Sequence, residues 1–230
     1  MKLETLIAAA ALAALSVPAA AAPVDWIHWT RGTPGAKGSA SGVVDLGAPG
    51  PDASDISVEY AGEIAFIQTS GGTNYWTGNP SPYVSPEVDN APGTPDIIAL
   101  SSATSKTLTF SAPVHNLFFA VVSLNGNGYA FNEDFDILSY GCGYWGCGTL
   151  TKEIVGSEYR LIGSGEPHGV IRFNRAVTSI TWTSLTNEYW NGFTVGTYGA
   201  APPIPEPSTL ALASLGLLGI IAAARRRRDA

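Results

Sequence analysis

The sequence predicts an all-β domain over residues 22–199, an antiparallel β-sandwich with a jelly-roll-like arrangement, flanked by a signal peptide and a C-terminal transmembrane helix. Short runs of alternating apolar residues are separated by Gly, Pro, Asn and Asp throughout this region. No apolar stripe with a 3.6-residue period is long enough for a major helix. The region is long enough for one well-buried core and short for two, so we expect a single sandwich of two sheets.

The N-terminus has the features of a secretory signal peptide over residues 1–21. Lys2 lies near the start, an apolar stretch covers residues 6–15, and Pro18 precedes the alanine run 19–21 that forms an Ala-x-Ala cleavage site. We therefore expect an exported chain that begins near Ala22.

Ten segments of the exported region have the composition of strands. The run 117–122 is apolar on both faces, which predicts a central strand, whereas 178–183 alternates and should expose one face. The predicted strands are residues 25–30, 56–68, 107–110, 117–124, 135–140, 153–155, 159–162, 169–173, 177–184 and 192–195.

Two segments rich in Gly and Pro, residues 32–50 and 71–95, are expected to be long loops. Residues 200–204 form an Ala/Pro spacer after the domain.

The two cysteines are five positions apart in a glycine-rich segment. Cys142 and Cys147 are an even pair in a chain predicted to reach an oxidising compartment, which favours a disulfide closing a tight loop. A redox motif would have two intervening residues, and His28, His115 and His168 show no spacing typical of zinc ligands.

Aromatic residues in the loops are candidates for glycan binding. Tyr75, Trp76 and Tyr83 lie in the proline-rich segment, and Tyr144 and Trp145 lie between the cysteines. Prolines and a small disulfide would present these rings rigidly, although tryptophan in a β-domain also commonly packs in the core. Packing is the interpretation for the remaining tryptophans, which are Trp26, Trp29, Trp182 and Trp190.

One polar cluster is a candidate calcium site. Asn132, Glu133, Asp134 and Asp136 offer the oxygen ligands that Ca²⁺ prefers, but they lack the EF-hand spacing, so a solvated turn is the alternative. The same carboxylates could also be an acid/base pair for glycoside hydrolysis if they faced each other across a cleft.

The charge balance and the motifs exclude several classes of function. Residues 23–204 contain seven basic and sixteen acidic residues, a balance of −9, which argues against nucleic-acid binding. Neither 163–165 nor 32–39 has the spacing of a nucleophile elbow or a phosphate loop. We therefore expect a protein that is not an enzyme.

The C-terminus combines a Pro-Glu-Pro motif, an apolar run and a cluster of arginines. Pro205, Glu206 and Pro207 precede an uncharged apolar run over 210–224, and Arg225, Arg226, Arg227 and Arg228 follow it. As a helix the run would rise about 22 Å, short for a bilayer core of about 30 Å, but flanking arginines can snorkel to the headgroups. The positive-inside bias keeps the arginines cytoplasmic and the domain on the other side of the membrane.

This tail resembles the PEP-CTERM sorting signal of Gram-negative bacteria over residues 205–230. The resemblance implies recognition and processing by an exosortase-like membrane enzyme, anchoring in the inner membrane with the domain in the periplasm, and then release to the cell surface or exterior. Such organisms make exopolysaccharide, which the resemblance implies as a partner.

The exported domain also resembles ectodomains often carried by such tails, which implies a β-sandwich and transfers no catalytic residue. The segments that carry this resemblance are residues 25–30, 71–76, 95–98, 135–139, 165–173 and 190–196.

We therefore expect a structural or adhesive role alongside exopolysaccharide or biofilm, without catalysis and without a cofactor other than structural calcium. A carbohydrate-binding module, with or without calcium, is the alternative, and a glycan-active hydrolase is the third.

Overall fold

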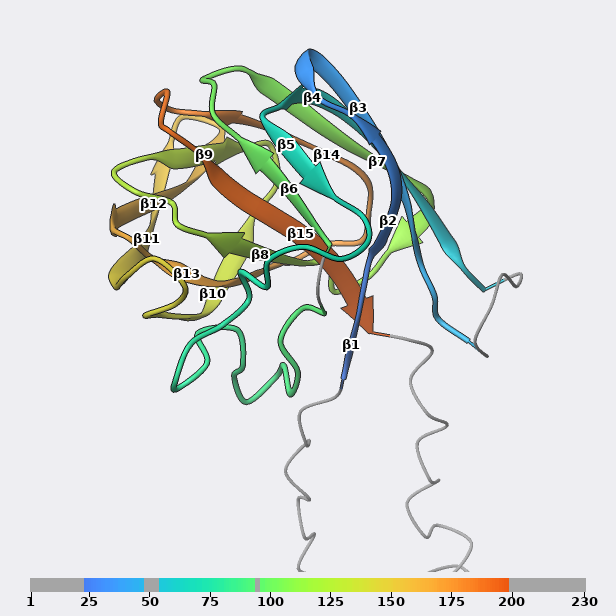
Figure 1. The fold of residues 1–230 in the computed structure, drawn as a ribbon, viewed down its shortest axis with the longest axis horizontal. Coiled ribbons are helices and arrows are strands. Elements are labelled where there is room, and N and C mark those ends of the chain that lie inside the picture. The colour runs from blue at the N-terminus through green and yellow to red at the C-terminus, as the bar shows by residue number, and fades with distance from the viewer. Residues whose placement is uncertain (1–22, 48–53, 94–95, 199–230) are drawn as a thin grey trace, which may run out of the picture.

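The computed structural model describes residues 23–47, 54–93 and 96–198, which fold into two antiparallel sheets (Figure 1). Fifteen strands and no helix occur in this part of the chain, which confirms the predicted all-β class. Across the same described ranges, no helix is long and apolar enough to cross a membrane. The predicted signal peptide and C-terminal helix lie outside the described residues.

The first sheet has seven strands in the order β10-β13-β8-β15-β6-β5, with β1 also paired to β15. Its strands are β1 (Val24–Trp26), β5 (Phe66–Gln68), β6 (Ile97–Leu100), β8 (Phe118–Val122), β10 (Phe135–Gly141), β13 (His168–Phe173) and β15 (Asn191–Tyr198).

The second sheet has eight strands in the order β11-β12-β9-β14-β7-β4-β3-β2. Its strands are β2 (His28–Thr33), β3 (Gly35–Val44), β4 (Ile56–Ile64), β7 (Ser105–Val114), β9 (Gly128–Phe131), β11 (Gly148–Val155), β12 (Glu158–Gly165) and β14 (Val177–Ser184).

The main hydrophobic core lies between the two sheets and is rich in aromatic rings. Phe119 of β8 stacks on Phe193 of β15, with ring centroids 4.9 Å apart and planes 9° apart. Trp182 of β14 meets Phe193 edge to face at 5.1 Å. Aromatic pairs in these geometries add to the area burial that stabilises the core. The burial of Trp29 and Trp182 confirms that these two tryptophans are packing residues.

A second cluster covers the other face of the seven-stranded sheet. Phe118 and Val122 of β8 point away from the main core and pack with Trp76, Tyr83 and other residues of the segment between β5 and β6. This segment runs beneath the sheet in Figure 1. Both faces of β8 are thus buried, as its continuous apolar sequence predicts.

The prediction of a loop over residues 32–50 is wrong, because ten of these residues form β3 (Gly35–Val44). Alternate residues of this strand, including Gly38, Ala40 and Gly42, are buried. A Cβ on Gly42 would lie 2.6 Å from the carbonyl oxygen of His28 and 2.8 Å from Ile27. Small residues at period two therefore mark a tightly packed strand here, although their composition is typical of a loop.

Two predicted strands are each divided between the sheets. The segment 56–68 contains β4 and β5, and the chain changes sheet at Ala65, whose amide donates to the Ala99 carbonyl at 2.8 Å. The segment 25–30 likewise contains β1 and the start of β2.

Strands β6 and β9 were not predicted, and β11 is longer than the predicted 153–155. The predicted long loop between β5 and β6 is confirmed over the described residues 71–93.

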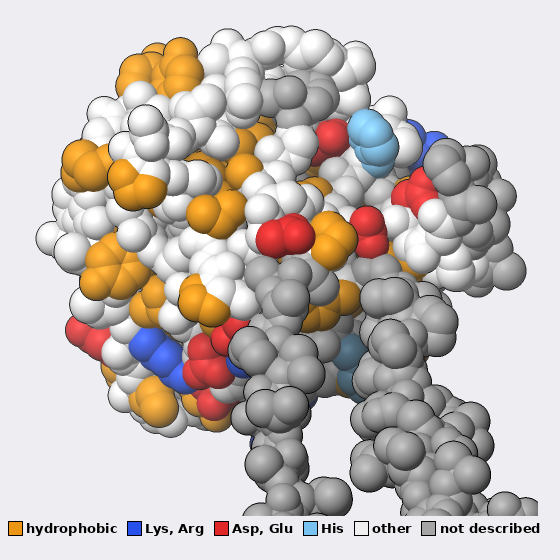
Figure 2. Space-filling view, turned by 90° about the horizontal axis from the view of Figure 1, so that it is seen from below, with side chains coloured by type: hydrophobic (Ala, Val, Ile, Leu, Met, Phe, Trp, Pro, Cys, Tyr) orange, Lys and Arg blue, Asp and Glu red, His pale blue; other side chains and the backbone are white. Residues whose placement is uncertain are grey.

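The start of β1 and the end of β15 lie side by side, since Val24 pairs with Tyr198. Both ends of the described domain are therefore on the same side of the molecule (Figure 1). Seen from that side, Asp and Glu side chains lie in several places between apolar patches (Figure 2).

Candidate functional site

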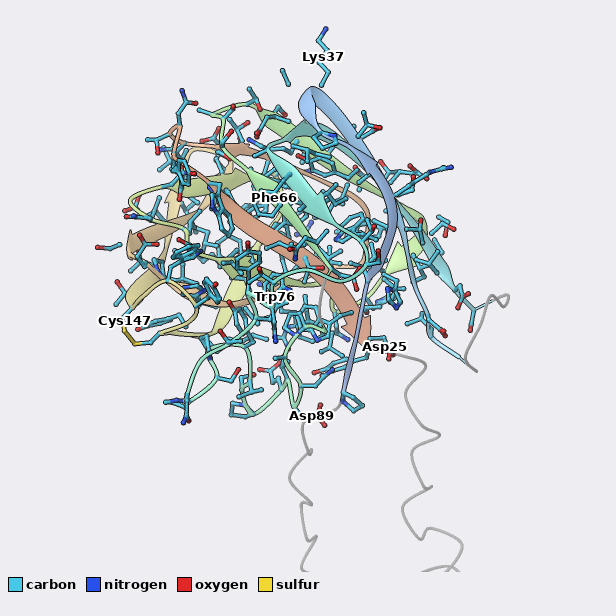
Figure 3. All side chains as sticks on the ribbon, in the orientation of Figure 1. Asp25, Lys37, Phe66, Trp76, Asp89 and Cys147 are labelled. Carbon is cyan, nitrogen blue, oxygen red and sulfur yellow. A yellow bond between two sulfur atoms is a disulfide. The ribbon has the colours of Figure 1, made fainter. Side chains whose placement is uncertain are left out.

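Two of the five predicted glycan-binding aromatic residues are buried. Trp76 is 4% exposed and Tyr83 is 0% exposed, and their rings meet edge to face at 5.2 Å beneath the seven-stranded sheet (Figure 3). The hydroxyl of Tyr83 is 3.0 Å from Nδ1 of the buried His168. The expectation that these two rings are exposed is wrong, because they join the long loop to the sheet that it covers.

The other three rings lie at the surface and meet one another. Tyr144 and Trp145 are 43% and 53% exposed, and Tyr75 is half-buried. Tyr75 contacts Tyr144 at 5.0 Å and Trp190 at 5.1 Å, and Trp145 contacts Trp190 at 6.0 Å between centroids. Phe66 packs beneath them, 5.0 Å from Trp190. We call Phe66, Tyr75, Tyr144, Trp145 and Trp190 the aromatic cluster.

A disulfide between Cys142 and Cys147 presents two of these rings, as the sequence predicts. Its S–S length is 2.03 Å, and the Gly143 amide donates to the Gly146 carbonyl at 2.8 Å across the loop. The Cys147 carbonyl accepts from the Glu166 amide at 2.9 Å, which joins the disulfide loop to the turn between β12 and β13. Tyr144 and Trp145 thus sit on a short, cross-linked loop, which limits their motion.

A pocket of about 270 Å³ opens beside the aromatic cluster. Four separate loops form it: the segment after β8, the disulfide loop, the turn after β12 and the segment before β15. Its lining residues are Ser123, Asn125, Trp145, Glu166, Glu188, Tyr189 and Trp190. Of these, sequence analysis singled out only Trp145 and Trp190, the latter as a packing residue.

Two carboxylates line the pocket, and Asn125 contacts both. Its side-chain amide donates to Glu166, which also accepts from the Ser123 hydroxyl. Its backbone amide donates to Glu188 at 3.3 Å, and Asn191 donates to the same carboxylate at 2.9 Å. Ser123 has a φ of 55°, a left-handed conformation that is uncommon for residues other than glycine and that is enriched at binding and catalytic sites.

The surroundings of Glu188 disfavour its charged form. Burial raises the pKa of Glu188, hydrogen bonds from Asn127, Asn191 and Asn125 oppose the increase, and the negative charge of Glu166 adds to it. A cation between the two groups would offset both the desolvation and the repulsion.

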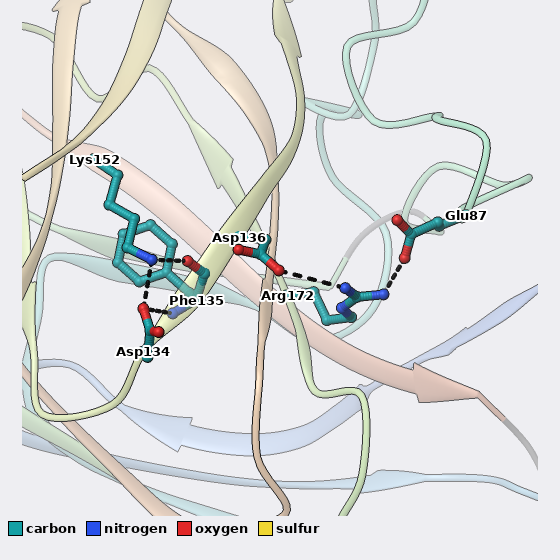
Figure 4. A network of polar contacts seen from close by, with 6 residues as sticks. All are labelled: Glu87, Asp134, Phe135, Asp136, Lys152 and Arg172. Atoms are coloured by element: carbon teal, nitrogen blue, oxygen red, sulfur yellow. Dashed lines mark hydrogen bonds and ion pairs between the residues drawn. The ribbon is translucent and has the colours of Figure 1, made fainter.

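Three of the four predicted calcium ligands interact with other groups, and Figure 4 shows two of these three, Asp134 and Asp136. Lys152 Nζ pairs with Asp134 and lowers the pKa of that carboxyl, while Arg172 lies between Glu87 and Asp136. Asn132 accepts a hydrogen bond from the Thr181 amide at 2.9 Å, and Glu133 is half-buried. Among the described residues, no three or more His, Cys, Asp or Glu side chains are grouped so that they could hold a metal ion.

Comparison with known proteins identifies the C-terminal motif. Residues 203–228 match the family model of the PEP-CTERM protein-sorting motif, which contains the predicted residues 205–207 and 225–228. These residues lie outside the described part of the structure. No curated protein and no solved structure matches the chain. The motif indicates an exported protein that is anchored in a membrane, processed by an exosortase and sorted to the surface.

Proposed function

From the PEP-CTERM sorting motif at residues 203–228, we propose that this exported protein acts at the cell surface as a non-catalytic adhesive protein that binds exopolysaccharide. The aromatic cluster and its adjoining pocket would be the glycan-binding surface. Before processing, the domain would face the periplasm of a Gram-negative bacterium, because the C-terminal arginines favour the cytoplasmic side.

The observation that carries this proposal is the grouping of exposed rings beside a pocket. The apolar C–H face of a sugar can pack on an aromatic ring, and a few polar groups in the pocket then orient the sugar hydroxyls. Tyr144 and Trp145 offer exposed rings, and Glu166, Asn125 and Glu188 offer polar groups. The cross-linked loop reduces the entropy lost when a ligand orders these rings.

The position of the pocket on the domain suits a binding site that is presented away from the C-terminal tail. Residues 188–190 immediately precede β15, whereas the sorting motif follows its other end. A strand of this length spans about 24 Å. Cys147 closes the loop that carries Trp145, and Asp25 pairs with Thr197 near the end of β15. The two residues lie on different sides of the molecule in Figure 3. The pocket therefore lies at the end of β15 opposite the end from which the chain continues to the sorting motif.

Binding of the purified exported protein to an array of glycans, including the host's own exopolysaccharide, tests this function. We expect binding that Trp145→Ala weakens by about tenfold or more. Tyr140→Ala is the control, because Tyr140 is 50% exposed and lies outside the pocket. Equal affinity of the two variants and the unmodified protein would contradict the proposal. Parallel measurements with Ca²⁺ and with a chelator test whether binding depends on calcium.

The exosortase partner can be tested separately. The C-terminal mass of the protein should differ between a strain that has its exosortase and one that lacks it. Identical products would contradict processing of the tail.

A glycan-active hydrolase is the second candidate, favoured by the raised pKa of Glu188 beside Glu166. Glycosidases use a pair of carboxyl groups, and a raised pKa suits the one that acts as the general acid. Release of reducing ends from a bound glycan, abolished by Glu188→Gln, would support this candidate over simple adhesion.

A further inference from the structure

We propose that the pocket selects a de-N-acetylated amino sugar and binds its free ammonium group between Glu166 and Glu188. This inference rests on the proposed glycan-binding function and names the class of glycan. Four features support it: the charge of the pocket, the kind of groups that hold the carboxylates, the buried hydrogen bonds behind those groups, and the aromatic walls.

The charge of the pocket is negative and is not balanced by its own lining. Glu166 and Glu188 line it, and no lysine or arginine is among the lining residues. Burial raises the pKa of Glu188, and the negative charge of Glu166 adds to the increase, so the two groups interact electrostatically. A ligand that brings a positive charge would relieve this repulsion, whereas a uronic acid or a phosphate would increase it.

The groups that hold the carboxylates are neutral. Glu166 accepts from the Ser123 hydroxyl and the Asn125 amide, and Glu188 accepts from Asn191 and from the backbone of Asn125. These bonds fix the orientation of the carboxylates and leave their charge uncompensated. Elsewhere in the described domain, Asp134 and Asp136 pair with Lys152 and Arg172. Each carboxylate oxygen also has acceptor capacity beyond one hydrogen bond.

Buried hydrogen bonds behind the carboxylates keep this arrangement rigid. Asn191, which donates to Glu188, itself accepts from the hydroxyl of the fully buried Tyr129. Asn127 is also buried and accepts from the backbone amides of Gly128 and Thr186. Groups positioned in this way do not have to reorganise when a charged ligand arrives, which favours affinity.

The walls of the pocket suit a sugar ring with an ammonium group. Trp145 and Trp190 are 6.0 Å apart at an interplanar angle of 78°, and Tyr189 is 94% exposed. Aromatic rings attract cations over their faces and also pack on the C–H face of a sugar. A volume of about 270 Å³ is small for a drug-sized ligand and suits about one sugar unit of a longer chain. An amino sugar has both the positive charge that the carboxylates would bind and the sugar ring that would pack on the aromatic walls.

Affinity measurements with defined oligosaccharides test the proposal. The probes are a glucosamine hexamer, an N-acetylglucosamine hexamer, a neutral glucose hexamer and a lysine hexamer, each titrated into the full exported chain. We expect the glucosamine hexamer to bind about tenfold or more tightly than its N-acetylated counterpart, and to lose affinity as salt rises.

Single substitutions measure separately how much the two carboxylates and the aromatic rings contribute to affinity. Glu166→Gln and Glu188→Gln should each remove about tenfold of the affinity for the glucosamine hexamer, with little effect on the N-acetylated chain. Glu153→Gln is the matched control, because Glu153 is an exposed carboxylate on β11 outside the pocket. Tyr189→Ala, at a ring that is almost fully exposed, should weaken both sugars without affecting folding.

The outcomes distinguish this inference from the proposed function. Equal affinity for the two hexosamine chains would overturn the amino-sugar selection while leaving glycan binding intact. No binding to any sugar would overturn both. Binding of the lysine hexamer as tight as that of the glucosamine hexamer would show a site for cationic groups in general and would overturn its assignment to a sugar.

Discussion

Replacing His168 with glutamine should remove much of the acid sensitivity of this domain. His168 is the first residue of β13 and is 0% exposed. Its Nδ1 lies 3.0 Å from the Tyr83 hydroxyl, and its Nε2 has no hydrogen-bond partner among the described residues. Burial lowers the pKa of His168 from 6.5 to about 4, because a buried imidazolium loses its hydration.

The sign and size of the effect follow from proton linkage. Between pH 6.5 and pH 4 the unfolded chain binds a proton at His168 that the folded chain does not, so stability falls as the pH falls. The difference between the two pKa values corresponds to about 3.4 kcal/mol once the pH is well below 4. Between pH 7 and pH 5 the loss should be about 2 kcal/mol, a large part of the stability of an ordinary domain.

Urea unfolding followed by tryptophan fluorescence at pH 7 and pH 5 measures this loss. His168→Gln removes the titrating group, so this variant should lose about 2 kcal/mol less than the unmodified chain over the interval, whatever its stability at pH 7. His115→Gln, at an exposed histidine, is the control and should behave as the unmodified chain does. The same pH-dependent loss in His168→Gln as in the control would refute the reasoning.

Three further predictions concern packing and the cross-link. Gly143→Ala should lower the free energy of unfolding by about 1 to 3 kcal/mol in the same urea assay, because the added Cβ would lie 2.4 Å from the His168 ring. Gly141→Ala is the control. Its Cβ would lie at an ordinary 3.7 Å from Pro82, so it should change the free energy of unfolding by less than about 0.5 kcal/mol. Trp76→Ala should lower the free energy of unfolding by about 3 to 5 kcal/mol, and a loss below about 1 kcal/mol would contradict its place in the second core cluster. Replacing both cysteines with serine should cost about 2 kcal/mol, since the closed loop is short, and unchanged thermal stability under reducing conditions would argue against this contribution.

Much of the fold could be predicted from local patterns. The continuous apolar run around Phe118 indicates a strand buried on both faces, and the alternation around Ile180 indicates a strand with one exposed face; the structure has both. The sequence does not predict β3, because three of its four buried residues are glycine or alanine, which carry little hydrophobic signal. Their role depends on the close approach of Ile27 and His28, which a local pattern does not contain. The jelly-roll connectivity stays a prediction.

The candidate site could be predicted only in part. The cysteine spacing correctly predicts the disulfide loop, and with it the exposure of Trp145. Trp76 occurs in a proline-rich segment that also predicts exposure, but it is buried, because that segment lies on an apolar sheet face and the disulfide loop does not. The carboxylate of Glu188 gives no signal in the sequence, since its neighbours in the chain form no recognisable motif.

By itself, the sequence determined the all-β class, the disulfide pair and the sorting motif, because each depends on residues that are close together in the chain. Only the tertiary structure decided which rings are exposed and which carboxylates meet. Ser123, Glu166 and Glu188 come from three separate connections, and they converge because β8, β13 and β15 are neighbours in one sheet. Strand order is set by packing between distant segments, so the pocket that depends on it arises only in the folded chain.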